Sequence, residues 1–147
     1  MKTVVCGIGN SMKGDDGIGP AVIEKLKKEN LNPEDVMLID CGTAPENFLG
    51  RITWFDPARV IIVDAVDMGR EPGTVETINT GSIIGDRVST HNLPLSMFVS
   101  YLKDMFRNSL DIVFIGAQPN QTGFGLSMSE KGRLAVDEIK GRLMGML

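Results

Sequence analysis

Short apolar runs alternate with stretches of helical periodicity along this chain, and that alternation predicts a sheet covered by helices. The runs predict strands over 4–8, 36–40, 59–66 and 112–117, and the periodic stretches predict helices over 17–29, 45–55, 93–106 and 130–147. Residues 74–78 alternate in polarity and follow the third strand too closely for a crossover helix, which predicts an antiparallel strand. The fold class is therefore α/β, a three-layer α/β/α sandwich with a mixed five-stranded sheet.

The first strand leads directly into a glycine turn and then into two carboxylates. Gly7 and Gly9 allow a tight turn, and Asp15 and Asp16 precede the first predicted helix. In an open α/β sheet this loop lies at the carboxyl edge, where such folds bind ligands. The Gly-x-Gly pair also leaves a small nucleotide-binding domain open, although two carboxylates at the helix start would repel a phosphate. The simplest alternative is that one carboxylate caps the helix.

Two further residues are expected to come to the same edge. Right-handed crossovers favour the strand order 2-1-3, which places the end of strand 3 beside the loop that carries Asp16. Asp64 ends that strand, and His91, the only histidine, lies in the polar stretch before the third helix. One imidazole and two carboxylates suit Zn²⁺ or Ni²⁺, but Asp16 and Asp64 can equally share a proton for acid–base work without a metal. A solvated strand end and a surface histidine are the simpler interpretations.

Composition narrows the possible functions. The 147 residues predict one domain, 1–147, and a net charge of −4 without a basic cluster argues against nucleic-acid binding. No apolar run approaches the length that spans a bilayer, and the N-terminus has too few apolar residues for a signal peptide, so a cytoplasmic protein is expected. Cys6 is predicted to be a buried core residue. Cys41 ends the second strand near the ligand edge, which leaves a soft metal contact open.

Several segments, in one order, resemble the maturation endopeptidases of [NiFe] hydrogenases. They include Gly-Ile-Gly-Asn-Ser-Met-Lys-Gly-Asp-Asp-Gly at 7–17, Asp-Cys-Gly-Thr-Ala-Pro-Glu-Asn at 40–47 and Val-Asp-Ala-Val-Asp-Met-Gly at 63–69. Ser-Thr-His-Asn-Leu-Pro-Leu at 89–95, Gly-Ala-Gln-Pro at 116–119 and Gly-Phe at 123–124 complete the set. The segments at 44–47 and 90–92 look most like the branch that serves formate-hydrogenlyase-type, energy-converting hydrogenases.

The resemblance implies an enzyme, a peptide hydrolase that removes the C-terminal extension of a nickel-loaded large-subunit precursor. It implies a phosphorylase/hydrolase-like sheet in the order 2-1-3-5-4, and it matches the family's metal-contacting residues to Asp16, Asp64 and His91. These residues would contact nickel carried by the precursor, with zinc or another divalent metal as the alternative. Some relatives have Glu in place of Asp16, and many have glycine where Cys41 stands. A non-catalytic, nickel-dependent protein that only binds the precursor also fits the same residues.

Overall fold

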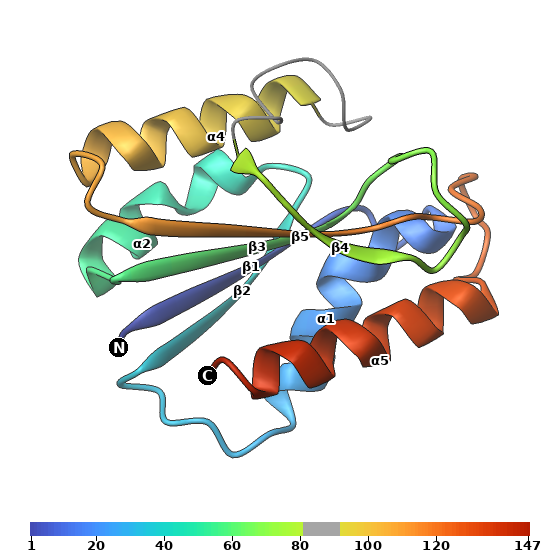
Figure 1. The fold of residues 1–147 in the computed structure, drawn as a ribbon, viewed down its shortest axis with the longest axis horizontal. Coiled ribbons are helices and arrows are strands. Elements are labelled where there is room, and N and C mark those ends of the chain that lie inside the picture. The colour runs from blue at the N-terminus through green and yellow to red at the C-terminus, as the bar shows by residue number, and fades with distance from the viewer. Residues whose placement is uncertain (81–91) are drawn as a thin grey trace.

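The computed structural model describes residues 1–80 and 92–147. Its strands form one five-stranded sheet in the order β2-β1-β3-β5-β4 (Figure 1). They are β1 (Thr3–Ile8), β2 (Val36–Gly42), β3 (Arg59–Ala65), β4 (Val75–Ile78) and β5 (Asp111–Ala117). All neighbouring strands are parallel except β4, which pairs antiparallel with β5. The predicted order and the predicted direction of each strand are confirmed.

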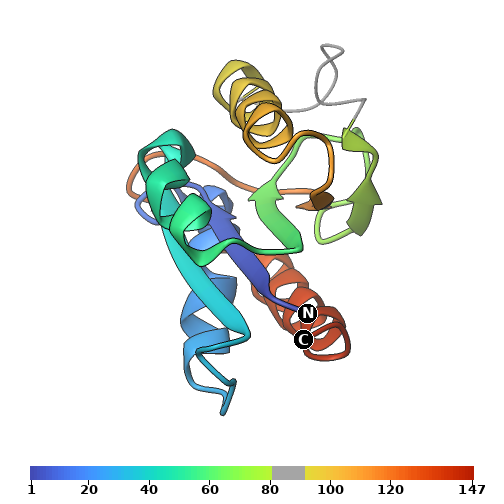
Figure 2. The same ribbon diagram turned by 90° about the vertical axis from the view of Figure 1, so that its left-hand side faces the viewer.

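Helices cover both faces of the sheet, which confirms the three-layer sandwich (Figures 1 and 2). Helices α1 (Ile18–Lys27) and α5 (Glu130–Met144) lie on one face, and α2 (Leu49–Phe55) and α4 (Asn92–Met105) lie on the other. A 3₁₀ turn, η2 (Pro45–Phe48), precedes α2 where the sequence predicts a continuous helix. Helix α1 ends two residues before the predicted Glu29, because the amides of Lys28 and Glu29 both bond to carbonyls three residues back. No helix among the described residues is long and apolar enough to cross a membrane.

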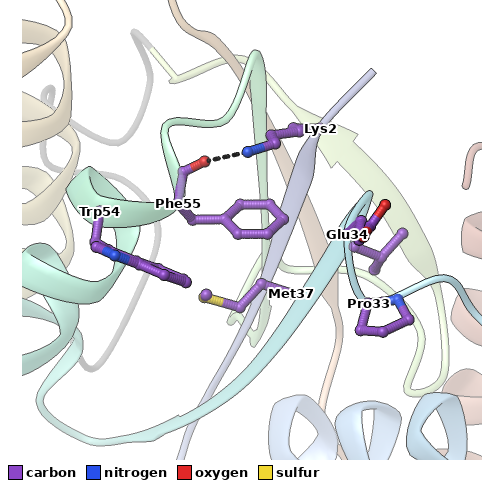
Figure 3. Close-up of a pocket in the computed structure, with 7 residues that line it drawn as sticks. Lys2, Pro33, Glu34, Met37, Trp54 and Phe55 are labelled. Carbon is purple, nitrogen blue, oxygen red and sulfur yellow. Dashed lines mark hydrogen bonds between the residues drawn. The ribbon is translucent and has the colours of Figure 1, made fainter.

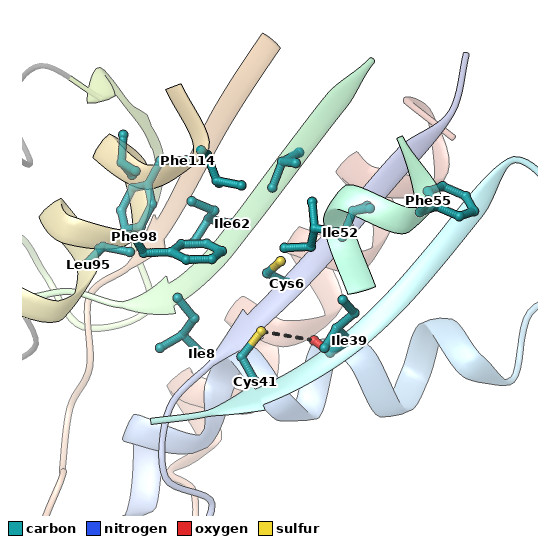
Figure 4. Packing of buried hydrophobic residues seen from close by; sticks show 14 of the residues in the cluster. Cys6, Ile8, Ile39, Cys41, Ile52, Phe55, Ile62, Leu95, Phe98 and Phe114 are labelled. Carbon is teal, nitrogen blue, oxygen red and sulfur yellow. Dashed lines mark hydrogen bonds between the residues drawn. The ribbon is translucent and has the colours of Figure 1, made fainter. Parts of the chain in front are cut away.

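The sheet separates two hydrophobic cores, and both cysteines belong to one of them. Figure 4 shows Cys6 and Cys41 among the apolar side chains packed between the sheet and helices α2 and α4. The Cys41 thiol donates to the carbonyl of Ile39 at 3.9 Å, and hydrogen bonding with Cys41 together with burial raises the pKa of the Cys6 thiol. The metal contact that the sequence leaves open for Cys41 is therefore wrong, because this thiol faces the core and not the edge of the sheet.

Three glycines bring α1 unusually close to the carboxyl ends of β1 and β3. A Cβ at Gly19, in the first turn of α1, would lie 2.5 Å from the backbone nitrogen of Ile8 and 2.7 Å from the carbonyl oxygen of Val63. A Cβ at Gly7 would lie 2.6 Å from the side chain of Ile23, and Gly9 has a φ of 142° that only glycine adopts readily. The loop between β1 and α1 is thus held tightly against the edge of the sheet, as the glycine turn predicts.

Candidate functional site

The loops that follow β1, β3 and β5 gather at one edge of the sheet, at the right of Figure 1, where α1 begins. Asp16 lies there in η1 (Gly14–Gly17), a 3₁₀ turn that leads into α1 and packs against β3. One oxygen of its carboxylate, Oδ2, accepts the backbone N–H of Asn10 at 2.9 Å, which fixes the side chain within its own loop. Asp16 is only 4% exposed, yet it lines a cavity of about 220 Å³.

Asp64 lies near the end of β3, directly before a residue that lines the same cavity. It pairs in register with Gly116 of β5 and is fully buried, and the following Ala65 lines the cavity together with Asp16. Because β1 and β3 are neighbours, the elements that carry the two predicted carboxylates meet at one edge. A fully buried carboxylate is maintained only where other groups compensate for its lost hydration, and its place at the carboxyl end of a parallel strand makes Asp64 a candidate site residue.

His91, the third predicted site residue, lies outside the described residues. Among residues 1–80 and 92–147, no three His, Cys, Asp or Glu side chains are arranged to hold a metal ion. The carboxylates alone do not make a complete metal site, and the predicted role of His91 stays a prediction. The two-carboxylate part of the predicted set does supply the hard oxygen ligands that divalent cations bind.

Two residues at the cavity, Asp67 and Gln118, have no role assigned from the sequence. The carboxylate of the exposed Asp67 accepts from the Gln118 side chain at 3.2 Å. The Gln118 side-chain oxygen accepts the backbone N–H of Met68 at 2.6 Å and that of Arg70 at 3.3 Å, so it shapes the loop after β3. Gln118 directly follows the last parallel strand, and its position after β5 is the signal that could have identified it.

The cavity has an acidic and polar character. Besides Ala65 and Pro119, its lining consists of Asp16, Asp67, Gln118, Asn120 and Thr122. Carboxylates concentrated in a recess produce a negative potential, which attracts a metal cation and repels a phosphate. This chemistry favours a site for a cation or for hydrolysis by a carboxylate-activated water over a nucleotide site.

Asp15 acts as an anchor and does not cap its own helix, which corrects the capping interpretation. Neither η1 nor α1 has a side-chain cap at its N-terminus. The fully buried Asp15 carboxylate instead accepts the Ser129 amide at 2.7 Å, the Ser129 hydroxyl at 2.7 Å and the Asn120 amide at 2.8 Å. Ser129 is the N-cap of α5, so Asp15 ties the loop that carries Asp16 to the start of the last helix.

The hydrogen bonds to Asp15 make its charge stabilising. Burial opposes ionisation, but the bonds from Ser129, Asn120 and Gln121 outweigh it and lower the pKa of Asp15. A carboxylate whose pKa is lower in the folded state stabilises the protein above its unfolded pKa of about 3.9. That stabilisation is lost as the pH falls below this value and through the folded pKa.

Replacing Asp15 by Asn should therefore destabilise the protein in a pH-dependent way. We expect Asp15→Asn to lower the free energy of unfolding by about 2 kcal/mol at pH 7, because charge-assisted bonds become neutral ones and an amide N–H₂ faces backbone donors. Urea unfolding of both proteins checks this, and the difference between them should shrink below about pH 4. A difference that stays the same down to pH 3 would contradict the role of the charge.

A second hollow, of about 600 Å³, lies at the opposite edge of the sheet (Figure 3). Trp54 and Phe55, at the end of α2, and Met37 of β2 form its apolar wall, and Lys2 donates to the Phe55 carbonyl at 3.2 Å. Its lining combines one acidic and one basic side chain with apolar ones, and it is remote from the carboxyl ends of the strands. The acidic cavity beside Asp16 is therefore the better candidate for chemistry.

Comparison with known proteins gives one consistent result. The family described as hydrogenase maturation protease matches residues 20–145. The chain is similar to the hydrogenase 3 maturation protease of Escherichia coli strain K12, with 37% identity over 146 residues that cover 99% of this chain and 90% of that relative.

Solved structures agree with this match. The structure is similar to the crystal structure of the [NiFe] hydrogenase maturation protease HycI from Thermococcus kodakarensis KOD1, with a TM-score of 0.88 and 38% identity over 99% of this chain and 92% of that one. It also shares its fold with the hydrogenase maturating endopeptidase HybD from E. coli, at a TM-score of 0.85 over 100% of this chain and 92% of that one, with 23% identity. These matches show that this chain belongs to the hydrogenase maturation protease family.

Proposed function

We propose that this protein is the endopeptidase that removes the C-terminal extension from the nickel-loaded large-subunit precursor of a [NiFe] hydrogenase. The observation that carries the proposal is the acidic cavity at the carboxyl edge, lined by Asp16 and by Ala65, which directly follows the buried Asp64 in β3. Family membership supplies the class of reaction, and the cavity supplies carboxylates at the place where an α/β sheet binds its ligand.

In this proposal the nickel arrives with the substrate. Asp16 and Asp64 would contact it as hard oxygen ligands, and His91 would add a borderline-soft nitrogen ligand. Two carboxylates and one imidazole leave coordination positions for the precursor's own ligands, so the protein alone should hold nickel or zinc weakly. Recognition of installed nickel would restrict cleavage to precursors whose metal centre is loaded.

The same carboxylates can also serve hydrolysis. A carboxylate near the scissile bond can take a proton from the attacking water and return it to the leaving amine. A divalent metal beside the bond would lower the pKa of that water and polarise the carbonyl. Asp16 lines the cavity and is positioned by the Asn10 amide, which suits it to orient a water or a metal there.

Mass spectrometry of the precursor tests the proposed function directly. The purified protein is incubated with the large-subunit precursor with and without nickel, and the precursor mass is followed over time. We expect loss of one C-terminal peptide from the nickel-loaded precursor only. Stable binding of the loaded precursor with no change in its mass would instead support the non-catalytic, precursor-binding alternative.

Substitution of His91 tests the third member of the proposed set. We expect His91→Ala to abolish processing of the nickel-loaded precursor while changing the free energy of unfolding by less than about 0.5 kcal/mol, because the sequence around it is polar. Urea unfolding and the same mass measurement check both halves of this expectation. If the folded variant processes the precursor at the wild-type rate, His91 is not part of the site.

A further inference from the structure

Three exposed apolar side chains lie on two turns at the edge of the sheet that holds the acidic cavity. Phe124 is 72% exposed, Met12 is 62% exposed and Leu126 is 47% exposed. Single exposed hydrophobic residues are common on protein surfaces, but residues gathered on neighbouring turns near a site often mark a binding surface. We refer to Met12, Phe124 and Leu126 as the apolar lip.

Backbone hydrogen bonds join the two turns of the lip. The amide of Gly125 donates to the carbonyl of Met12 at 2.8 Å, and the amide of Gly14 donates to the carbonyl of Leu126 at 3.0 Å. The two turns that carry the lip are therefore held side by side, although they are more than 100 residues apart in the sequence. The buried Asp15 anchors its far end, since it accepts the amides of Asn120 and Ser129 on either side of residues 121–128.

The turns themselves do not require apolar residues. In the turn 123–126, the amide of Leu126 donates to the carbonyl of Gly123 at 3.2 Å, and Gly125 supplies the positive φ of 83° that a type II turn needs at its third position. Phe124 occupies the second position, where polar residues and proline are common and a large aromatic has no backbone role. Met12 likewise sits in a turn that Asn10 stabilises, because the Asn10 side chain accepts the Met12 amide at 2.9 Å.

The two loops that carry the lip also line two separate hollows at this edge of the sheet. Asn120 and Thr122, which precede Phe124 in the same loop, line the cavity beside Asp16. On the other side, Met12 and Asn10 line a groove of about 350 Å³, and the Asn10 amide also holds the Asp16 carboxylate. Phe124 is only two residues after Thr122, and an extended peptide rises about 3.3 Å per residue, so a substrate chain in the cavity could extend to Phe124 within a few residues.

We propose that the apolar lip binds an apolar side chain of the precursor's C-terminal segment, a few residues from the bond that is cut. This inference rests on the proposed function, because it names where the same substrate continues beyond the cavity. Polar groups in the cavity would position the reacting bond, and the lip would supply binding energy by removing apolar surface from water.

Steady-state processing of the nickel-loaded precursor tests the lip. We expect Phe124→Ala, and more strongly Met12→Ala combined with Phe124→Ala, to raise KM about tenfold while kcat stays within about twofold of the wild type, because a side chain that touches substrate and transition state equally contributes to binding alone. Trp54→Ala is the matched control, because Trp54 is 80% exposed at the opposite edge and should leave both constants unchanged.

A binding measurement separates this proposal from the proposed function. The Asp16→Asn protein, with and without Phe124→Ala, is titrated with the same precursor, and we expect the second substitution to weaken binding about tenfold. If the wild type does not shorten the precursor, the proposed function fails. In that case this titration alone shows whether the lip binds the precursor. Unchanged KM and unchanged binding in the Phe124→Ala proteins would overturn the proposal that the lip binds the precursor. A loss of kcat at constant KM would overturn it too.

Discussion

Replacing either Asp16 or Asp64 by Asn should reduce processing of the nickel-loaded precursor by at least about 100-fold. The change keeps the size of each side chain but removes the negative charge that would contact nickel or take a proton from water. Asp16 lines the cavity, and the buried Asp64 directly precedes Ala65, which lines it too, so both substitutions act at this edge of the sheet. Mass spectrometry of the precursor over time measures the rate.

Asp111→Asn is the matched control for these variants. Asp111 begins β5, so it lies at the opposite edge of the sheet, and it is exposed. The Asp111→Asn substitution removes the same charge at a position far from the cavity, and the variant should process the precursor at the wild-type rate. Wild-type processing by a folded Asp16→Asn protein would show that this edge is not the catalytic site.

A methyl group at Gly19 should destabilise the fold and disturb the site together. We expect Gly19→Ala to lower the free energy of unfolding by about 3 kcal/mol, because the added Cβ would meet backbone atoms of both Ile8 and Val63, which cannot move aside as a flexible side chain can. To relieve this close approach, the start of α1 must move away from β1 and β3, and η1 with Asp16 directly precedes it. Processing should therefore fall even where the variant is still folded.

Gly50→Ala provides the comparison for this second prediction. Gly50 lies in α2, and a Cβ there would have no neighbour within 4 Å. Alanine favours a helix over glycine, so this variant should be as stable as the wild type or up to about 1 kcal/mol more stable. Urea unfolding of the three proteins gives the values, and equal stability of Gly19→Ala and the wild type would contradict the close packing of α1.

The sequence predicts the fold well because its signals are local and mutually consistent. The run from Val60 to Val63 is apolar throughout, as a strand covered on both faces requires, and β3 is the central strand. Right-handed crossovers then restrict where β1 and β2 can lie. The ends of helices are less well predicted, as at α1, because a last turn with bonds to the third residue back leaves the hydrophobic pattern unchanged.

The roles of individual side chains at the site are predicted less completely. Asp15 and Asp16 are adjacent and chemically identical, so no pattern indicates that one anchors α5 while the other faces the cavity. That division depends on contacts with Asn120 and Ser129, which the chain brings close only in the folded state. The direction of the Cys41 side chain is a second example. Its position at a strand end predicts a thiol at the ligand edge, whereas the pleat of β2 directs the thiol into the core.

The Asp15 anchor has a consequence for the order in which the protein can become active. Asp15 emerges early in synthesis, but Asn120 and Ser129, which hold its loop in place, are 105 and 114 residues later in the chain. At ordinary translation rates that interval lasts about 5–20 s. During this interval neither Asn120 nor Ser129 is available to hold the loop that carries Asp16. A nascent or truncated chain therefore lacks a complete site, and peptidase activity requires synthesis to reach the last helix.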